Sequence, residues 1–292
     1  MPAMNPLIPD FDERLEALVQ SALREDLGDG DHTTQACIDP EALGRAELKI
    51  KEAGILAGVE VAQKIFVLYD PQARVTIHRL DGQTMQAGQT AFEVRSRIST
   101  ILSCERLVLN CMQRMSGIAT LTREYTNRLQ GYHTRLLDTR KTTPNFRLLE
   151  KEAVRIGGGH NHRFGLFDMI LIKDNHIDYC GGIEKAIQKA SRYVSDKKPG
   201  LKIEVETRSL EEVRRVLAVG GVDRIMLDNF SPGLLREALE LIAGRYETEA
   251  SGGIHLENLE QFAATGVDFI SSGAVTHQAR SLDLSLKASM IQ

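Results

Sequence analysis

The sequence predicts an α/β fold: an incomplete barrel of parallel strands alternating with helices, preceded by an α+β domain with a mostly antiparallel sheet. Two observations carry this prediction. Six short apolar runs between residues 136 and 274 each end in polar or glycine residues, as buried parallel strands do. Before them, residues 45–97 alternate between apolar and polar side chains, as half-buried strands do. The six runs are 136–141, 169–175, 203–207, 225–229, 250–253 and 270–274.

Helical patterns follow the second to fifth of these runs, so the segment reads as repeated β-α units. Ser209 and Glu212 form a capping box at the start of one helix, and Ser231 with Pro232 starts another. Six strands are fewer than the eight of a complete barrel. In such a barrel every strand delivers its C-terminal end to one face, where active sites lie.

The N-terminal part is predicted to start with a helix capped by Asp10 and stopped at Gly28, followed by a turn over residues 29–34. A long helical stretch begins near Thr100, and we expect Ser116-Gly117 to interrupt it. This interruption sets the domain boundary. The first domain covers 1–116 and the barrel 117–276, and the tail 277–292 is expected to pack with the first domain.

Composition excludes several classes of protein. A net charge of −4 and a pI near 6.1 argue against a nucleic-acid partner, and no apolar run is long enough to span a membrane. Residues 1–6 lack the pattern of a secretory signal. The four cysteines (Cys37, Cys104, Cys111 and Cys180) have no CxxC spacing and are typical of reduced thiols, so we expect a cytoplasmic protein.

Basic side chains are the main candidates for chemistry. Arg140 and Lys141 end one strand, Lys173 ends another, and His162 and Arg163 follow the glycines at 157–159. Arg106 in the preceding helical stretch completes the candidate set. Any one of them could be a solvated surface charge, but cations gathered at strand ends require an anionic ligand. Arginine suits carboxylate or phosphate.

Two carboxylates and two glycine turns complete the predicted cavity. Glu206 and Asp228 end successive strands and could bind sugar hydroxyls, hold Mg²⁺ through water or stabilise a developing cation. Either carboxylate could instead simply form an ion pair with a neighbouring Arg or Lys. The last two strands end in Ser251-Gly252-Gly253 and Ser272-Gly273-Ala274, where backbone N–H groups could bind phosphate.

The spacing of the residues argues against several other kinds of functional site. His160 and His162 have no third metal ligand at a matching interval, and the glycines at 157–159 do not fit the dinucleotide fingerprint. The chain has neither a Gly-x-Ser-x-Gly elbow nor a Walker loop. Lys173 could form a Schiff base, although the surrounding cations favour anion binding.

The motifs together resemble the quinolinate phosphoribosyltransferase family nearly end to end. The resemblance is carried by 25–28, 31–34, 105–110, 138–144, 158–163, 172–176, 205–206, 227–230 and 250–254. Its most specific part is the combination of Thr139-Arg140-Lys141-Thr142 with Lys173-Asp174-Asn175-His176. The resemblance implies an incomplete barrel of six or seven strands.

The resemblance also implies the roles of the candidate residues. The carboxylates of quinolinate would be received by Arg106, Arg140, His162, Arg163 and Lys173. Lys141 would face the phosphates of phosphoribosyl pyrophosphate, whose 5′-phosphate would lie at Ser251–Gly253 and Ser272–Ala274, and Thr139 would also bind substrate. Glu206 and Asp228 would lie by the ribose and its Mg²⁺, bound indirectly. Arg106 would be donated across the interface of a homodimer.

The implied reaction fits these residues. Both substrates are polyanions, which the cations would hold together, and Glu206 and Asp228 could stabilise an oxocarbenium-like ribose as pyrophosphate leaves. Lys141 and Lys173 are the other candidate catalytic residues. Three alternatives remain: a related phosphoribosyltransferase that uses another acid, a barrel lyase with Lys173 as nucleophile, and a non-catalytic anion-binding protein.

Overall fold

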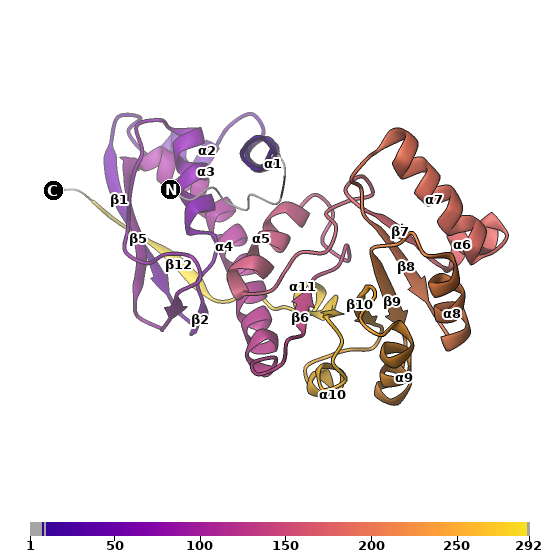
Figure 1. Cartoon of the computed structure of the whole chain (residues 1–292). Coiled ribbons are helices and arrows are strands. Elements are labelled where there is room, and N and C mark those ends of the chain that lie inside the picture. Colours follow the sequence, from indigo (N-terminus) through magenta and orange to yellow (C-terminus); the bar gives the residue numbers. More distant parts are fainter. Residues whose placement is uncertain (1–7, 9, 291–292) are drawn as a thin grey trace. The chain divides into compact units, whose positions relative to one another are not determined.

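The computed structural model describes residue 8 and residues 10–290 (Figure 1). The chain forms two compact units. The first comprises Met1–Arg123, Thr142–Gly158 and Val275–Gln292, and the second comprises Glu124–Lys141 and Gly159–Ala274. The absence of a secretory pattern at residues 1–6 concerns a segment outside the described residues.

The first unit contains a four-stranded antiparallel sheet in the order β12-β1-β5-β3 (Figure 1). Its strands are β1 (Leu43–Ile50), β3 (Arg74–Ile77), β5 (Thr90–Arg97) and β12 (Leu284–Met290), and β2 (Gly54–Ile55) pairs separately with β4 (Thr84–Met85). The predicted alternation is present in β1, where Ala46, Leu48 and Ile50 are buried. Because β12 pairs along β1, the C-terminal segment belongs to this sheet.

The helices of the first unit differ from the prediction in three places. Helix α1 (Phe11–Leu27) ends at Gly28 as expected, but Asp10 has φ 58° and its side chain makes no cap bond, so the predicted cap is wrong. The expected turn over 29–34 contains a short helix, α2 (His32–Cys37), whose first turn Asp31 caps through the Thr34 N–H. A third helix, α3 (Val59–Tyr69), lies within the segment predicted as strands.

Helix α4 (Ile98–Arg128) runs without a break, so the predicted interruption at Ser116-Gly117 is wrong. Glycine is needed at 117 for packing: a Cβ there would lie 1.9 Å from the Arg280 carbonyl oxygen. The division between units falls after Arg123, inside this helix, and α5 (Arg147–Gly157) belongs to the first unit.

The second unit contains a six-stranded parallel sheet in the order β6-β11-β10-β9-β8-β7, which confirms the predicted incomplete barrel. Its strands are β6 (Arg135–Leu137), β7 (Ile170–Ile172), β8 (Ile203–Thr207), β9 (Arg224–Asp228), β10 (Glu247–Ser251) and β11 (Phe269–Ser271). All six predicted runs therefore contain strands. Strands β6 and β7 are the two ends of the sheet.

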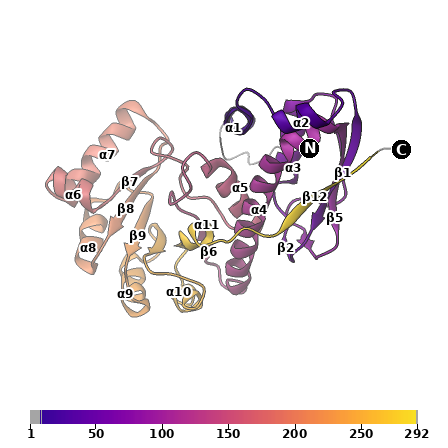
Figure 2. The ribbon, with the colours of Figure 1, turned by 180° about the vertical axis from the view of Figure 1, so that it is seen from behind.

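Helices connect these strands, and α7, α8 and α9 lie along one side of β7, β8 and β9 in both views (Figures 1 and 2). The helices are α6 (Asp174–Cys180), α7 (Ile183–Lys197), α8 (Leu210–Val219), α9 (Pro232–Ile242), α10 (Leu259–Ala263) and α11 (Ala274–His277). Ser209 accepts from the Glu212 N–H and Ser231 from the Leu234 N–H, as the sequence predicted for both caps. No helix in the described part of the chain has the length and apolar character needed to cross a bilayer.

Candidate active site

The parallel sheet brings the predicted site residues of the second unit to one edge. Ile172 pairs with Val205, and Asp228 pairs with Ser251, so the residues that end β7 to β10 lie side by side. Ser271 pairs with Leu137, which sets the loop after β11 beside the loop after β6. The sheet register therefore gathers the predicted cations, carboxylates and glycine turns at the C-terminal ends of the strands.

The loop after β6 is tied to residues 160–162 by a buried carboxylate. Asp138 is fully buried; its Oδ2 accepts from Asn161 Nδ2 at 2.7 Å and its Oδ1 from the His162 N–H at 2.8 Å. The backbones of 138 and 160 also pair, with Asp138 N 3.0 Å from the His160 carbonyl oxygen. Two segments far apart in sequence are thereby fixed next to each other.

Two arginines come from these two segments. Burial lowers the pKa of Arg163, and the nearby positive charge of Arg140 lowers it further. Arg163 Nη1 donates to the Met169 carbonyl oxygen at 3.1 Å, just before β7. A pair of like charges held this way favours an anionic ligand. Thr139 Oγ1 accepts from the Lys141 N–H at 3.0 Å and shapes the turn that carries Lys141.

His162 is directed into the protein rather than toward the cations. Its side chain is 7% exposed, and its Nε2 lies 3.0 Å from Glu204 Oε2. Its Nδ1 accepts from the Arg163 N–H at 2.7 Å. The ring thus faces the carboxylates of Glu204 and Glu249, and the expected role of His162 as a direct substrate ligand stays a prediction.

Lys173 follows β7 directly, beside the two carboxylates. Its backbone N–H donates to His176 Nδ1 at 3.0 Å. The pKa of Glu206 is raised by burial and by the negative charge of Asp228, and Lys173 partly offsets these effects. Asn229, with φ 57°, donates from Nδ2 to Asp228 Oδ2 at 2.7 Å and so orients that carboxylate.

The turn after β10 depends on glycine. Gly252 has φ 93°, and a Cβ there would lie 2.2 Å from Asn229 Oδ1. Asn258 Nδ2 donates to the Gly253 carbonyl oxygen at 3.0 Å. In the next loop, Ser272 Oγ donates to the Ile254 carbonyl oxygen at 3.0 Å. Two tight loops with little side-chain bulk thus lie next to each other, as close approach of an anion to backbone N–H groups requires.

Arg106 lies on α4 in the first unit and is exposed. The other predicted site residues belong to the second unit.

Sequence reasoning missed three residues of the site. Asp138, Asn161 and Asn229 orient other side chains or loops, and none of them was among the predicted site residues. A signal was available for Asp138, because a carboxylate directly after an apolar run at a predicted strand end is costly unless it has partners.

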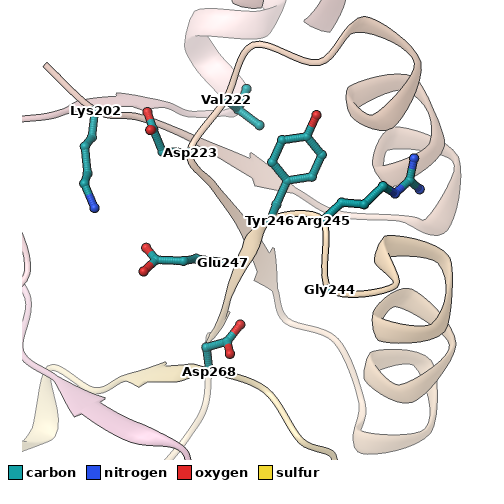
Figure 3. A pocket seen from close by; sticks show the side chains of 8 residues that line it. All are labelled: Lys202, Val222, Asp223, Gly244, Arg245, Tyr246, Glu247 and Asp268. Atoms are coloured by element: carbon teal, nitrogen blue, oxygen red, sulfur yellow. The ribbon is translucent and has the colours of Figure 1, made fainter. Parts of the chain in front are cut away.

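A separate hollow of about 530 Å³ lies at the opposite, N-terminal ends of the strands (Figure 3). Lys202, Asp223 and Asp268 directly precede β8, β9 and β11, and Glu247 begins β10. Figure 3 shows Lys202 and Glu247 extending to one side of these strands and Tyr246 and Arg245 to the other. The hollow is therefore not part of the predicted site.

Comparisons with known proteins agree with the geometry. The family models that match are the N-terminal domain of quinolinate phosphoribosyl transferase over residues 31–116 and its C-terminal domain over residues 118–287. Quinolinate phosphoribosyltransferase (decarboxylating) 2, mitochondrial, from Nicotiana glauca is 44% identical over 97% of this chain and 84% of its own. A probable nicotinate-nucleotide pyrophosphorylase (carboxylating) from Bacillus subtilis (strain 168) is 43% identical over 95% of this chain and 94% of its own.

Solved structures show the same fold. The crystal structure of NadC from Streptococcus pyogenes has a TM-score of 0.90 at 40% identity, covering 99% of this chain and 100% of that one. The nicotinate-nucleotide pyrophosphorylase from Francisella tularensis has a TM-score of 0.88 at 38% identity, with the same coverage. Matches to both domain models, with relatives above 40% identity along nearly the whole chain, show that this chain belongs to the quinolinate phosphoribosyltransferase family.

Proposed function

We propose that this chain transfers the phosphoribosyl group of phosphoribosyl pyrophosphate to the ring nitrogen of quinolinate. The products are nicotinate mononucleotide, pyrophosphate and CO₂, in the de novo synthesis of NAD. One observation carries the proposal: within this family's fold, Arg140 and Lys173 follow strands of the sheet that carries Glu206 and Asp228, and Arg163 lies near Arg140.

In this proposal each charged group takes the substrate group of opposite sign. Arg140, Arg163 and Lys173 bind the two carboxylates of quinolinate, since guanidinium groups match carboxylates in a bidentate way. Thr139 and Lys141 meet the phosphates of phosphoribosyl pyrophosphate. The loops 251–253 and 272–274 hold its 5′-phosphate, since the glycine at 252 lets the backbone approach an anion closely.

The chemistry needs positioning and charge more than proton transfer. As the bond from ribose C1 to pyrophosphate breaks, positive charge develops on the ribose, and Glu206 and Asp228 stabilise it. The quinolinate nitrogen then bonds to C1 and the ring becomes a pyridinium. The electron pair released when the adjacent carboxylate leaves as CO₂ stays on that ring carbon, stabilised by the positive nitrogen, and a proton from water then binds there to complete nicotinate mononucleotide.

Mg²⁺ fits the carboxylate side of the site. Glu206 and Asp228 are close enough for Asp228 to raise the pKa of Glu206, so a cation between them and the substrate would relieve their repulsion. Oxygen ligands of this kind suit Mg²⁺, which Glu206 and Asp228 would hold through water. When bound, it supplies charge neutralisation for the departing pyrophosphate.

Incubation of the purified chain with quinolinate, phosphoribosyl pyrophosphate and Mg²⁺ tests the proposal. We expect nicotinate mononucleotide and CO₂ in equal amounts. Turnover of nicotinate but not quinolinate would identify a different phosphoribosyltransferase, and trapping of substrate carbon on Lys173 by borohydride would identify a lyase. Binding of both substrates without any product would reduce the chain to an anion-binding protein.

We further propose a homodimer in which Arg106 of one subunit completes the site of its partner. Arg106 is exposed on α4, as a residue donated to another subunit must be in an isolated chain. Mixing inactive Arg106→Ala and Lys173→Ala proteins should restore activity to about half of the sites in mixed dimers. These sites carry both residues, which come from different chains.

A matched control mixes Lys173→Ala with Glu206→Gln. Both residues belong to the second unit of one chain, so no mixed dimer has an intact site and activity should stay absent. Failure of the first mixture despite subunit exchange, measured by mass spectrometry, would show that each subunit builds its site alone.

We propose that the protein is cytoplasmic. Its four cysteines are free thiols, and burial raises the pKa of Cys104 and Cys111 to about 12, which keeps both protonated and unreactive. Cell fractionation with antibody detection tests this, and enrichment in an organelle would contradict it.

A further inference from the structure

A layer of buried charged side chains lies on the parallel sheet, two residues along the strands from the candidate active site. Glu204 is two residues before Glu206 on β8, and Glu249 is two residues before Ser251 on β10. Side chains two apart in a strand share a face, so Glu204 and Glu249 lie on the face that carries the site. Both carboxylates are fully buried, which is costly unless they have partners.

Those partners are His162 and Arg224. His162 Nε2 lies 3.0 Å from Glu204 Oε2 and 3.4 Å from Glu249 Oε2. Arg224 Nη1 lies 3.1 Å from Glu249 Oε2. Arg224 also stacks over Phe269, 4.1 Å from the ring centre, so its position is fixed by packing as well as by charge.

The hydrogen bonds define the proton positions in this layer. Because His162 Nδ1 accepts the Arg163 N–H, that nitrogen carries no proton, and it is Nε2 that lies against the carboxylates. Protonating Nδ1 would bring two N–H groups against each other, so the geometry favours a ring that is protonated at Nε2 alone.

This arrangement needs no metal ion. His162, Glu204 and Glu249 could offer three ligand atoms to a cation. However, Arg224 already lies against Glu249, and His162 lies against both carboxylates, so both carboxylates have partners within the chain.

The layer connects directly to a residue of the proposed site. The imidazole of His162 holds the backbone N–H of Arg163, whose side chain bonds the Met169 carbonyl oxygen near Arg140. Rotation of the imidazole would release this N–H and move the arginine. The orientation of the imidazole is set by its contacts with Glu204 and Glu249.

We propose that Glu204 and Glu249 are positioning residues for quinolinate binding, which hold Arg163 in place through His162. This inference rests on the proposed function, since it assigns Arg163 to a quinolinate carboxylate.

The decisive comparison is between Glu204→Gln and Glu204→Ala. Glutamine keeps the size of the side chain and an oxygen that can accept from His162 Nε2, so we expect less than a threefold rise in the KM for quinolinate. Alanine removes the acceptor, and we expect a rise of tenfold or more, with the KM for phosphoribosyl pyrophosphate within twofold of wild type. Calorimetry with quinolinate alone should show the same difference in affinity.

Glu247→Gln is the matched control. Like Glu249, Glu247 pairs with Arg224, at 3.0 Å, but it lies at the N-terminal end of β10 and its side chain is 44% exposed. Its kinetics should stay within twofold of wild type. A tenfold loss in Glu204→Gln, or equal losses for both substrates in Glu204→Ala, would overturn the proposal. If the alanine variant does not fold, the glutamine variant still decides between the outcomes.

Nitrogen NMR of labelled histidine provides a readout that is independent of turnover. We expect the His162 resonance to show a neutral ring protonated at Nε2 between pH 6 and pH 8, and to shift in Glu204→Ala. A doubly protonated ring, or one stoichiometric metal ion found by elemental analysis, would contradict the arrangement. Absence of quinolinate turnover in the wild-type chain would refute the proposed function and leave this spectrum unchanged.

Discussion

Asp138 offers the sharpest test of how the site is held together. Its fully buried carboxylate accepts hydrogen bonds from Asn161 Nδ2 at 2.7 Å and from the His162 N–H at 2.8 Å. Bonds to a charged group contribute about 1.5–3 kcal/mol each. Replacing Asp138 by alanine removes both acceptors and leaves two donors without them. We therefore expect a loss of about 3–6 kcal/mol in the free energy of unfolding.

Asparagine at the same position should cost much less. Asn161 can rotate its amide so that its oxygen faces the new NH₂ group, while the new carbonyl oxygen still accepts the His162 N–H. Both bonds survive and only the charge is lost, so Asp138→Asn should be destabilised by about 1–2 kcal/mol. Urea unfolding followed by circular dichroism measures both variants.

Kinetics and a matched control complete this test. Because residues 160–163 lose their anchor, the KM for quinolinate should rise more than tenfold in Asp138→Ala. Asp268→Ala also removes two hydrogen bonds, to Thr248 N and Oγ1, but at the exposed N-terminal end of the sheet. That control should leave the KM unchanged. An Asp138→Ala protein within about 0.5 kcal/mol of wild type would refute the reasoning, since that is the range of ordinary surface changes.

Three further predictions concern the reacting groups. Lys173→Ala should lower kcat/KM for quinolinate at least tenfold, and a smaller loss in steady-state kinetics would remove Lys173 from the site. If ionised Glu206 stabilises the ribosyl cation, activity should fall as pH drops through its raised pKa. Asp228→Asn removes a negative charge that raises the pKa of Glu206. In a pH series the acid limb of the activity profile should therefore move to lower pH, and a shift to higher pH contradicts the assignment. The affinity for quinolinate, measured by calorimetry, should stay nearly unchanged. Gly252→Ala would place a Cβ 2.2 Å from Asn229 Oδ1, at a residue whose φ is 93°. The KM for phosphoribosyl pyrophosphate should therefore rise, and an unchanged KM would exclude this loop from phosphate binding.

The barrel was predictable because its signals are local and repeated. Each of the six runs is a short apolar strand followed by polar residues, and the side-chain caps at Ser209 and Ser231 mark helix starts directly. The site residues at strand ends followed from the same pattern, because parallel strands deliver their C-terminal ends to one edge.

Local patterns failed where distant contacts decide the structure. Gly117 reads as a helix breaker, yet the long helix continues because the glycine makes room for the Arg280 carbonyl oxygen, more than 160 positions away in sequence. His162 reads as a cation beside Arg163, but burial against Glu204 and Glu249 turns it inward. The sequence does not reveal which carboxylates a histidine will meet from other strands.

The open sheet has a consequence for dynamics. In the described part of the chain, β7 lies at one end of the sheet order and bonds to β8. An edge strand of three residues opens more easily than β9 or β10, which have neighbours on both sides, so its amides should exchange with solvent faster. Lys173 directly follows this strand, and Arg163 donates a hydrogen bond to the carbonyl oxygen of Met169 just before it. Deuterium uptake at residues 170–172 should therefore slow most on quinolinate binding, which makes this short strand a natural reporter of ligand occupancy.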